Sequence, residues 1–191
     1  MSSAVGVVLA GGVSCRMGRP KALLALPNGK SFIEHALELL ARVTSLQLVA
    51  GGEAAWTPTG IKTYRHIADL HPGQGPLAGI EAALDSGFGT EYLVIAIDQL
   101  RLSDELLARL LEGDKNRLHS FRIQDSIVPL PIYVPIAARG VLKTIIAGDN
   151  RSLRRFIESA DPLFHNVPRE WAPNFESINT PDDYRRLCGV G

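Results

Sequence analysis

Residues 4–12 read AVGVVLAGG, an apolar and mostly β-branched run that ends in two consecutive glycines. Branched side chains favour extended backbone, and a short apolar run bounded by glycine is typical of a buried strand. Strands buried on both faces belong mainly to parallel sheets, whose two sides are covered by helices. This stretch therefore predicts a buried strand at residues 4–10 (AVGVVLA).

The rest of the chain alternates between strand and helix patterns. Strands are expected at 46–50 (LQLVA) and 91–97 (EYLVIAI), with a short one at 61–64 and two in 118–135. Helices are expected at 31–43, 77–86, 104–112, 136–146 and 151–159, and a last one after Thr180. Their predicted starts are Ser31 with Glu34 as a capping box, Ser103, Asp149-Asn150, and Thr180 followed by Pro181. This order predicts the α/β class.

Composition narrows the class of protein further. The 191 residues are expected to form one domain, residues 1–191, because no linker or repeat divides them. Twenty basic and twenty acidic residues give a net charge of zero, which argues against a general nucleic-acid binder. The apolar run at the N-terminus is too short to span a membrane. Cys15 and Cys188 form no metal pattern and suit a reducing compartment, so we expect a cytoplasmic protein.

The loop after the first strand, residues 9–21 (LAGGVSCRMGRPK), is the first candidate site. Gly11 and Gly12 allow the backbone to approach a ligand closely, and Arg16 and Lys21 bring two cations to the same loop. This combination suits a nucleoside triphosphate at the carboxyl edge of the sheet, although the P-loop pattern is absent. A turn with solvated Arg and Lys side chains is the alternative.

Asp98 ends the strand at 91–97 and is a candidate Mg²⁺ ligand, because Mg²⁺ is held by one or two carboxylates together with phosphates and waters. A turn-capping Asp is the alternative. Asp69 precedes residues 73–80 (GQGPLAGI), where Gly75 and the N-terminus of the following helix could contact a nucleotide. Turn and packing glycines would give the same pattern.

A third candidate is the run of residues 148–157 (GDNRSLRRFI), in which Arg151 and Arg155 share one helix face. Arg154 lies one turn from Arg151. These cations could dock a second, phosphate-bearing substrate, or they could form an ordinary solvated basic face.

Four motifs, taken together and in this order, resemble the molybdenum cofactor guanylyltransferase family. They are LAGG-x-S-x-RMG-x-x-KALL from Leu9, DLHPGQGPLAGI from Asp69, GDNRSLRRF from Gly148 and SINTPDDY from Ser177. Related cytidylyltransferases carry LAAG, so Gly11 favours guanine. The resemblance implies a three-layer, Rossmann-like nucleotidyltransferase fold with a mostly parallel sheet. It also implies transfer of GMP from GTP to the terminal phosphate of molybdopterin, with release of pyrophosphate.

The resemblance also implies roles for single residues. Leu9, Ala10, Gly11, Gly12 and Asp69 would contact the guanine nucleotide. Lys21 and Arg16 would stabilise phosphate charge, and Asp98 would bind Mg²⁺. Asn179, Arg151 and Arg155 would lie toward the pterin. A delivery chaperone or a molybdoenzyme is the expected protein partner.

Two positions depart from the family pattern. Pro20 stands where the family often has Asp before Lys21, and Pro-Lys is similar to sugar nucleotidyltransferases. Ile97 and Leu100 replace the Cys and Pro of a Cys-Asp-x-Pro setting around Asp98. These departures leave three alternatives: a nucleotidyltransferase that uses CTP or another phosphorylated acceptor, a GTP-binding homologue without catalysis, and an α/β domain for protein interaction.

Overall fold

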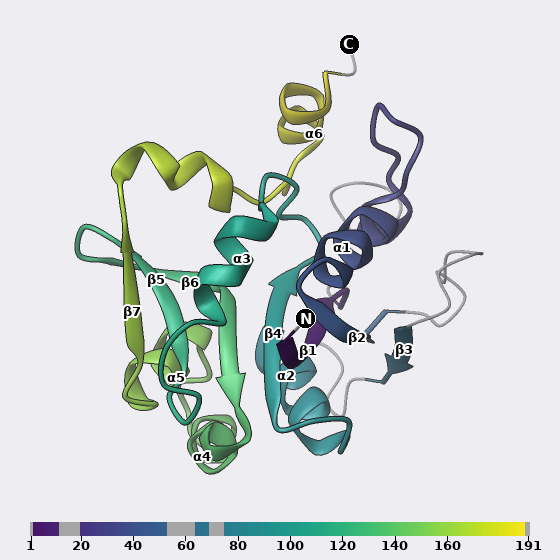
Figure 1. Cartoon of the computed structure of the whole chain (residues 1–191). Coiled ribbons are helices and arrows are strands. Elements are labelled where there is room, and N and C mark those ends of the chain that lie inside the picture. Colours follow the sequence, from purple (N-terminus) through teal and green to yellow (C-terminus); the bar gives the residue numbers. More distant parts are fainter. Residues whose placement is uncertain (1, 12–19, 53–63, 69–74, 190–191) are drawn as a thin grey trace.

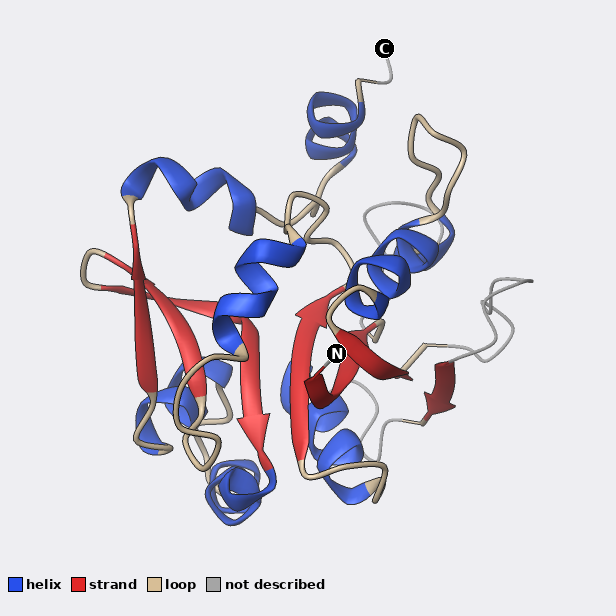
Figure 2. Ribbon diagram, in the orientation of Figure 1, coloured by secondary structure: helices blue, strands red, loops and turns tan. Residues whose placement is uncertain are grey.

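The computed structural model describes residues 2–11, 20–52, 64–68 and 75–189. Its described strands form a single seven-stranded sheet in the order β3-β2-β1-β4-β6-β5-β7, with helices on both faces (Figures 1 and 2). β1 lies between β2 and β4 and is parallel to both. Among the described strands only β6 runs against its neighbours, β4 and β5. The predicted α/β class with a mostly parallel sheet is confirmed.

The strands are β1 (Ser2–Leu9), β2 (Thr44–Ala50), β3 (Tyr64–Ile67), β4 (Glu91–Ala96), β5 (His119–Ile123), β6 (Ser126–Pro135) and β7 (Leu163–Val167). The α-helices are α1 (Phe32–Ala41), α2 (Pro76–Asp85), α3 (Asp104–Leu110), α4 (Arg139–Ala147), α5 (Leu153–Ser159) and α6 (Pro181–Cys188). Short 3-10 helices are η1 (Lys21–Leu23), η3 (Ile136–Ala138) and η4 (Arg169–Phe175).

The sheet separates two apolar layers, because alternate residues of a strand point to opposite faces. Val8 of β1 packs with α1 and α3, whereas Val5 and Val7 pack with α2, α4 and α5. Each layer contains fully buried aromatic side chains, such as Phe32 of α1 and Phe156 of α5. Burial on both faces explains why residues 4–9 are almost continuously apolar.

Three of the predicted helix starts are present as side-chain caps. Ser31 and Glu34 form a capping box at α1, Ser103 caps α3, and Thr180 forms a second capping box with Asp183 at α6. The backbone N–H and the hydroxyl of Ser31 donate to the Glu34 carboxylate and hold its pKa below the usual range. These local hydrogen bonds determine the residue at which each of the three helices begins.

Several sequence-based boundaries need correction. The cap of the helix at 151–159 is Ser152, which accepts a hydrogen bond from Arg155 N, so Asp149 and Asn150 lie before the helix. The short strand expected at 61–64 is β3, Tyr64–Ile67, and residues 61–63 lie outside the described part. β7 was not predicted, because it is a short, half-buried edge strand (LFHNV) without a clear alternation of apolar and polar residues.

Gly6 of β1 lies close to side chains of both α1 and β2. A Cβ atom there would lie 2.8 Å from Thr44 Oγ1 and 3.1 Å from Leu40 Cβ. We expect Gly6→Ala to lower the free energy of unfolding by about 1–3 kcal/mol, because an overpacked core must shift. Urea unfolding measures this change. Gly140→Ala in α4 is the control, since nothing lies within 4 Å of its Cβ position, and an equal loss in both variants would contradict the packing argument.

Candidate functional site

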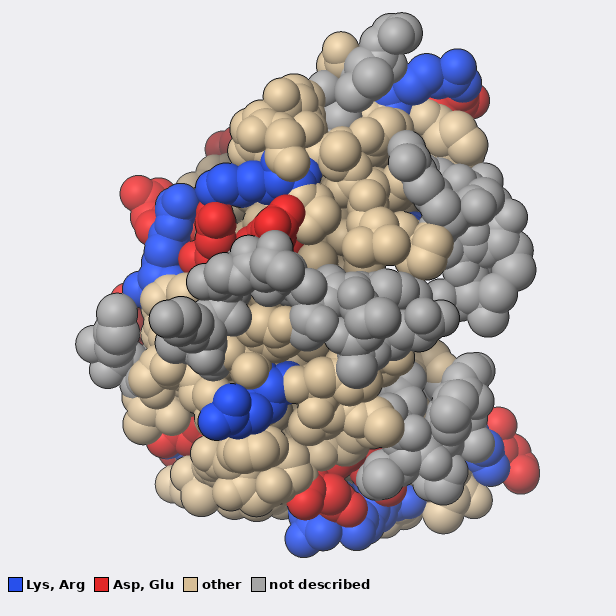
Figure 3. All heavy atoms as spheres, turned by 90° about the vertical axis from the view of Figure 1, so that its right-hand side faces the viewer, with Lys and Arg blue, Asp and Glu red and all other residues tan. Residues whose placement is uncertain are grey.

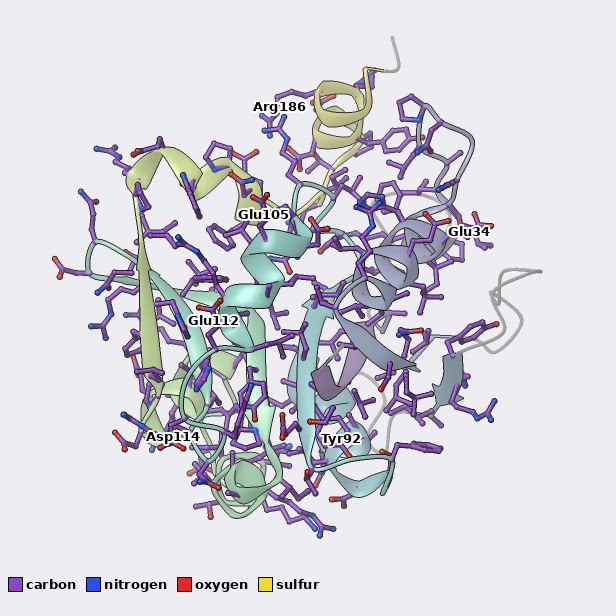
Figure 4. All side chains as sticks on the ribbon, viewed as in Figure 1. Glu34, Tyr92, Glu105, Glu112, Asp114 and Arg186 are labelled. Atoms are coloured by element: carbon purple, nitrogen blue, oxygen red, sulfur yellow. The ribbon has the colours of Figure 1, made fainter. Side chains whose placement is uncertain are left out.

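The ends of the central parallel strands lie together at one edge of the sheet. Leu9 of β1 is in register with Ala50 of β2 and Ala96 of β4. β4 runs from Tyr92, near the lower edge in Figure 4, toward the end of the molecule where Arg186 marks α6. β1 and β4 therefore end at the same edge as the start of α6, and this is the edge where open α/β sheets bind ligands.

Lys21, Asp98 and Asn179 meet at this edge. Lys21 Nζ donates to Asp98 Oδ2 at 2.6 Å and to Asn179 Oδ1 at 3.0 Å. The side chains of Lys21 and Asp98 are only 18% and 13% exposed, so the ion pair is partly shielded from water. Charge-assisted hydrogen bonds in such a setting fix geometry well. Three residues selected separately from the sequence thus form one cluster.

Lys21 is held by the short helix that it begins. Leu23 N donates to the Pro20 carbonyl, and the buried side chains of Ala22 and Leu24 anchor η1 to the core. Pro20 has φ −56°, which the pyrrolidine ring favours. Pro20 therefore presets the turn that presents Lys21, and this departure from the family pattern is compatible with the site.

Asp98 is held by its buried neighbours. Ile97 is 5% exposed and its N–H donates to the Leu9 carbonyl, which ties the end of β4 to the end of β1. Leu100 packs against the same apolar layer as Ile97. Ile97 and Leu100 thus anchor the Asp98 loop through core contacts.

Asn179 is positioned by the start of α6. Ile178 is fully buried and its N–H donates to the Asp98 carbonyl oxygen, while Asn179 N and Thr180 N both donate to Asp183 Oδ2. Hydrogen bonds from Thr180 and from the Asn179 backbone hold the pKa of Asp183 below its usual range. The capping box therefore fixes both α6 and the adjacent Asn179.

The residues predicted to contact a nucleotide fall into two groups. Leu9 and Ala10 are buried with their backbones paired, whereas Gly11 is exposed at the sheet edge. Gly75 is exposed at the N-cap of α2 with φ +71°, a conformation that favours glycine. Gly12, Arg16 and Asp69 lie outside the described residues.

Arg151 and Arg155 belong to a different part of the molecule from Asn179. Both are exposed on the α4–α5 segment, where Arg151 Nε donates to the Gly148 carbonyl. Figure 1 shows α5 well below α6. The structure thus brings Asn179 to Lys21 and Asp98, and it leaves the two arginines on the α4–α5 segment.

A hollow of about 340 Å³ adjoins the cluster on the β6 side. It is lined by Ala96 and Gln99, residues 127–130, Phe175 and Ser177. β4 and β6 are last paired at Val94–Ile132, and residues 129–131 form an irregularity in the pairing of β6 with β5. Pro129 and Pro131 lack the N–H groups that would continue the ladders, so the strands diverge there and leave space.

Sequence reasoning did not identify this hollow or the role of Gln99. The signal in the sequence is Pro129-Leu130-Pro131 within a strand, which is typical of a bulge or of a strand that leaves its partner. Gln99, directly after Asp98, is 5% exposed and fully hydrogen-bonded to backbone atoms. The burial of this glutamine beside Asp98 is a feature that the sequence alone does not reveal.

The charges of the described surface are mixed. On the face drawn in Figure 3, groups of Lys and Arg alternate with groups of Asp and Glu among uncharged residues. Within the described residues, no three His, Cys, Asp or Glu side chains gather as a metal cluster. None of the described helices is long and apolar enough to cross a membrane.

Known proteins resemble this chain over nearly its whole length. Residues 6–163 match the family model of the MobA-like NTP transferase domain. The molybdenum cofactor guanylyltransferase of Xanthomonas euvesicatoria is 32% identical over 95% of this chain and 93% of its own, and that of Rhodobacter capsulatus gives the same values. The molybdopterin-guanine dinucleotide biosynthesis protein A of Archaeoglobus fulgidus matches with a TM-score of 0.78, 28% identity and 97% coverage of both chains.

A family model that covers most of the chain and relatives that match almost end to end lead to one assignment. The chain belongs to the family of proteins with a MobA-like NTP transferase domain.

Proposed function

We propose that this chain is a molybdenum cofactor guanylyltransferase, which transfers GMP from GTP to the terminal phosphate of molybdopterin and releases pyrophosphate. The observation that carries the proposal is the Lys21–Asp98–Asn179 cluster at the carboxyl edge of the sheet. The names of the relatives support the choice of GTP and of molybdopterin. We further propose that residues 1–191 act as one domain, which the single sheet supports, and that the protein is cytoplasmic.

The chemistry needs positioning and charge stabilisation more than a general base. A phosphate monoester is an anion near neutral pH, so it can attack the α-phosphorus directly while pyrophosphate leaves in line. Lys21 would turn its ammonium from Asp98 to the phosphates, and Arg16 would add a second cation. The Nδ2 group of Asn179 is a donor that suits an acceptor phosphate oxygen, since its Oδ1 accepts from Lys21.

The described residues fit Mg²⁺ as the metal. Asp98 offers a carboxylate on a side chain that is 13% exposed, and Asn179 offers one amide oxygen. This small set of ligands suits an ion that takes most of its ligands from phosphates and water. Bound there, Mg²⁺ would neutralise charge on the phosphates. We therefore propose Asp98 as the protein ligand of Mg²⁺.

The topology supports separate sides for the two substrates. β1 and the glycines Gly11 and Gly75 lie on one side of β4, and the hollow beside β6 lies on the other. In-line transfer needs the attacking and leaving groups on opposite sides of the phosphorus. We propose that GTP lies over β1 and that the pterin enters the hollow, where Phe175 offers an aromatic surface. A delivery chaperone or a molybdoenzyme remains the proposed protein partner.

The first prediction concerns the ion pair. We expect Lys21→Ala to lower kcat about 100-fold through loss of phosphate charge stabilisation, and Asp98→Ala to lower it further and remove the response to Mg²⁺. Pyrophosphate release over a Mg²⁺ titration measures both effects. Lys30→Ala is the control. Lys30 also forms an ion pair with a carboxylate, but its partner is Glu38 of α1 and neither residue belongs to the Lys21–Asp98–Asn179 cluster. An unchanged Mg²⁺ response in Asp98→Ala would refute the metal assignment.

The second prediction concerns the base. With Mg²⁺ and molybdopterin, pyrophosphate should be released from GTP and not from CTP, because Gly11 leaves room for the larger base. Pyrophosphate release from CTP alone would agree with nucleotidyl transfer but would contradict the assignment of guanine from Gly11. GTP binding without any release would indicate a homologue that has lost catalysis or that uses another acceptor.

The third prediction tests the acceptor side. Leu130→Trp should raise the KM for molybdopterin by about tenfold or more while the KM for GTP stays unchanged, because the larger side chain fills the hollow. Steady-state kinetics with each substrate varied separately measures this difference. Leu46→Trp is the control, since Leu46 is also partly buried against the same apolar layer but lies near the start of β2, away from the site. Equal effects on both KM values would contradict the assignment of sides.

A further inference from the structure

Gln99 joins three segments of backbone through one buried side chain. Its Oε1 accepts from Ala96 N at 3.2 Å, and its Nε2 donates to the Leu130 carbonyl at 2.7 Å and to the Phe175 carbonyl at 3.4 Å. The residue is 5% exposed. The three contacts come from the end of β4, the irregular part of β6 and the last residue of η4.

The contacts of Gln99 with Ala96 and Leu130 lie where the pairing of β4 with β6 stops. Antiparallel pairing joins Tyr92 to Val134 and Val94 to Ile132, so the next pair in the same register would be Ala96 with Leu130. That pair does not form, because β6 has already diverged between Pro129 and Pro131. The amide of Gln99 takes the place of the missing pair: it accepts the Ala96 N–H and satisfies the Leu130 carbonyl.

The Gln99 side chain, which takes the place of Leu130 as the partner of Ala96, fixes the loop that carries Asp98. Ala96 and Gln99 are joined twice, because Gln99 N also donates to the Ala96 carbonyl at 3.3 Å. Asp98 lies inside this closed turn, and its carbonyl accepts from Ile178 N at 3.1 Å. The hydrogen bond from Gln99 to Phe175 holds the chain three residues before Ile178. The Gln99 amide therefore supports both the donor segment and the acceptor segment of the hydrogen bond between Ile178 N and the Asp98 carbonyl.

We propose that Gln99 is a positioning residue for nucleotidyl transfer, acting by holding Asp98 and the segment before Asn179 in one arrangement. The proposal rests on the proposed function. It requires a side chain with both a donor and an acceptor in a buried place, and an amide supplies both without charge. A carboxylate at this position would face two carbonyl oxygens, and an apolar side chain would leave buried backbone groups unpaired.

The test compares two buried glutamines. Gln99→Met keeps the approximate shape and removes all three hydrogen bonds. Gln47→Met is the matched control, because Gln47 is 1% exposed in β2 and its amide donates to Thr44, away from the cluster. We expect Gln99→Met to lower kcat by about 100-fold and to raise the Mg²⁺ concentration needed for half-maximal rate, because small misplacements of reacting groups are costly. Gln47→Met should lower the thermal midpoint with kcat and Mg²⁺ response unchanged.

Amide hydrogen exchange separates this proposal from the proposed function. Gln99→Met should speed exchange at Ala96 and Ile178, and this measurement needs no substrate. If the unmodified protein releases no pyrophosphate, the proposed function fails, and exchange at these two amides still shows whether Gln99 holds the segments. Unchanged exchange and unchanged kcat in Gln99→Met, or equal kinetic losses in Gln47→Met, would overturn the proposal.

Discussion

The register of β1 with its two parallel neighbours is the constraint on which the site depends. Because Leu9 lies beside both Ala50 and Ala96, the three strands end together at one edge of the sheet. The Ile97 N–H completes this arrangement by donating to the Leu9 carbonyl. Residues distant in sequence then need only short extensions to meet. Asn179 reaches Lys21 across 158 positions of sequence because Ile178 is buried against the Asp98 loop.

The parts of the fold that sequence predicts are those governed by local physics. Residues 4–9 and 91–96 form strands because burial on both faces demands continuous apolar runs. The capping boxes at Ser31 and Thr180 act within four residues and are readable for the same reason. β7 is not predicted from the sequence. This edge strand is stabilised by its pairing with β5, so it needs no clear alternation of apolar and polar residues.

The same distinction applies to the site. Lys21 and Asp98 can be selected from sequence, since a cation in a glycine-rich loop and a carboxylate after a buried strand each have a chemical meaning. Their contact with each other and with Asn179 depends on sheet order, which composition and spacing do not specify. Gln99 is harder still to find, because its role arises only where β6 departs from β4 beside Pro129 and Pro131.

The pairing of Lys21 with Asp98 has a consequence for how the proposed substrates would bind. A lone carboxylate at a triphosphate site repels its ligand, and a lone ammonium would compete with the metal for the phosphates. At 2.6 Å the two charges cancel locally, so the edge of the sheet meets the nucleotide without a strong field of either sign. A magnesium nucleotide complex would supply a new partner for each side chain: Asp98 would hold the metal, and Lys21 would pair with the phosphates. Because each side chain would exchange one partner for another, neither would be left unpaired in a partly buried place.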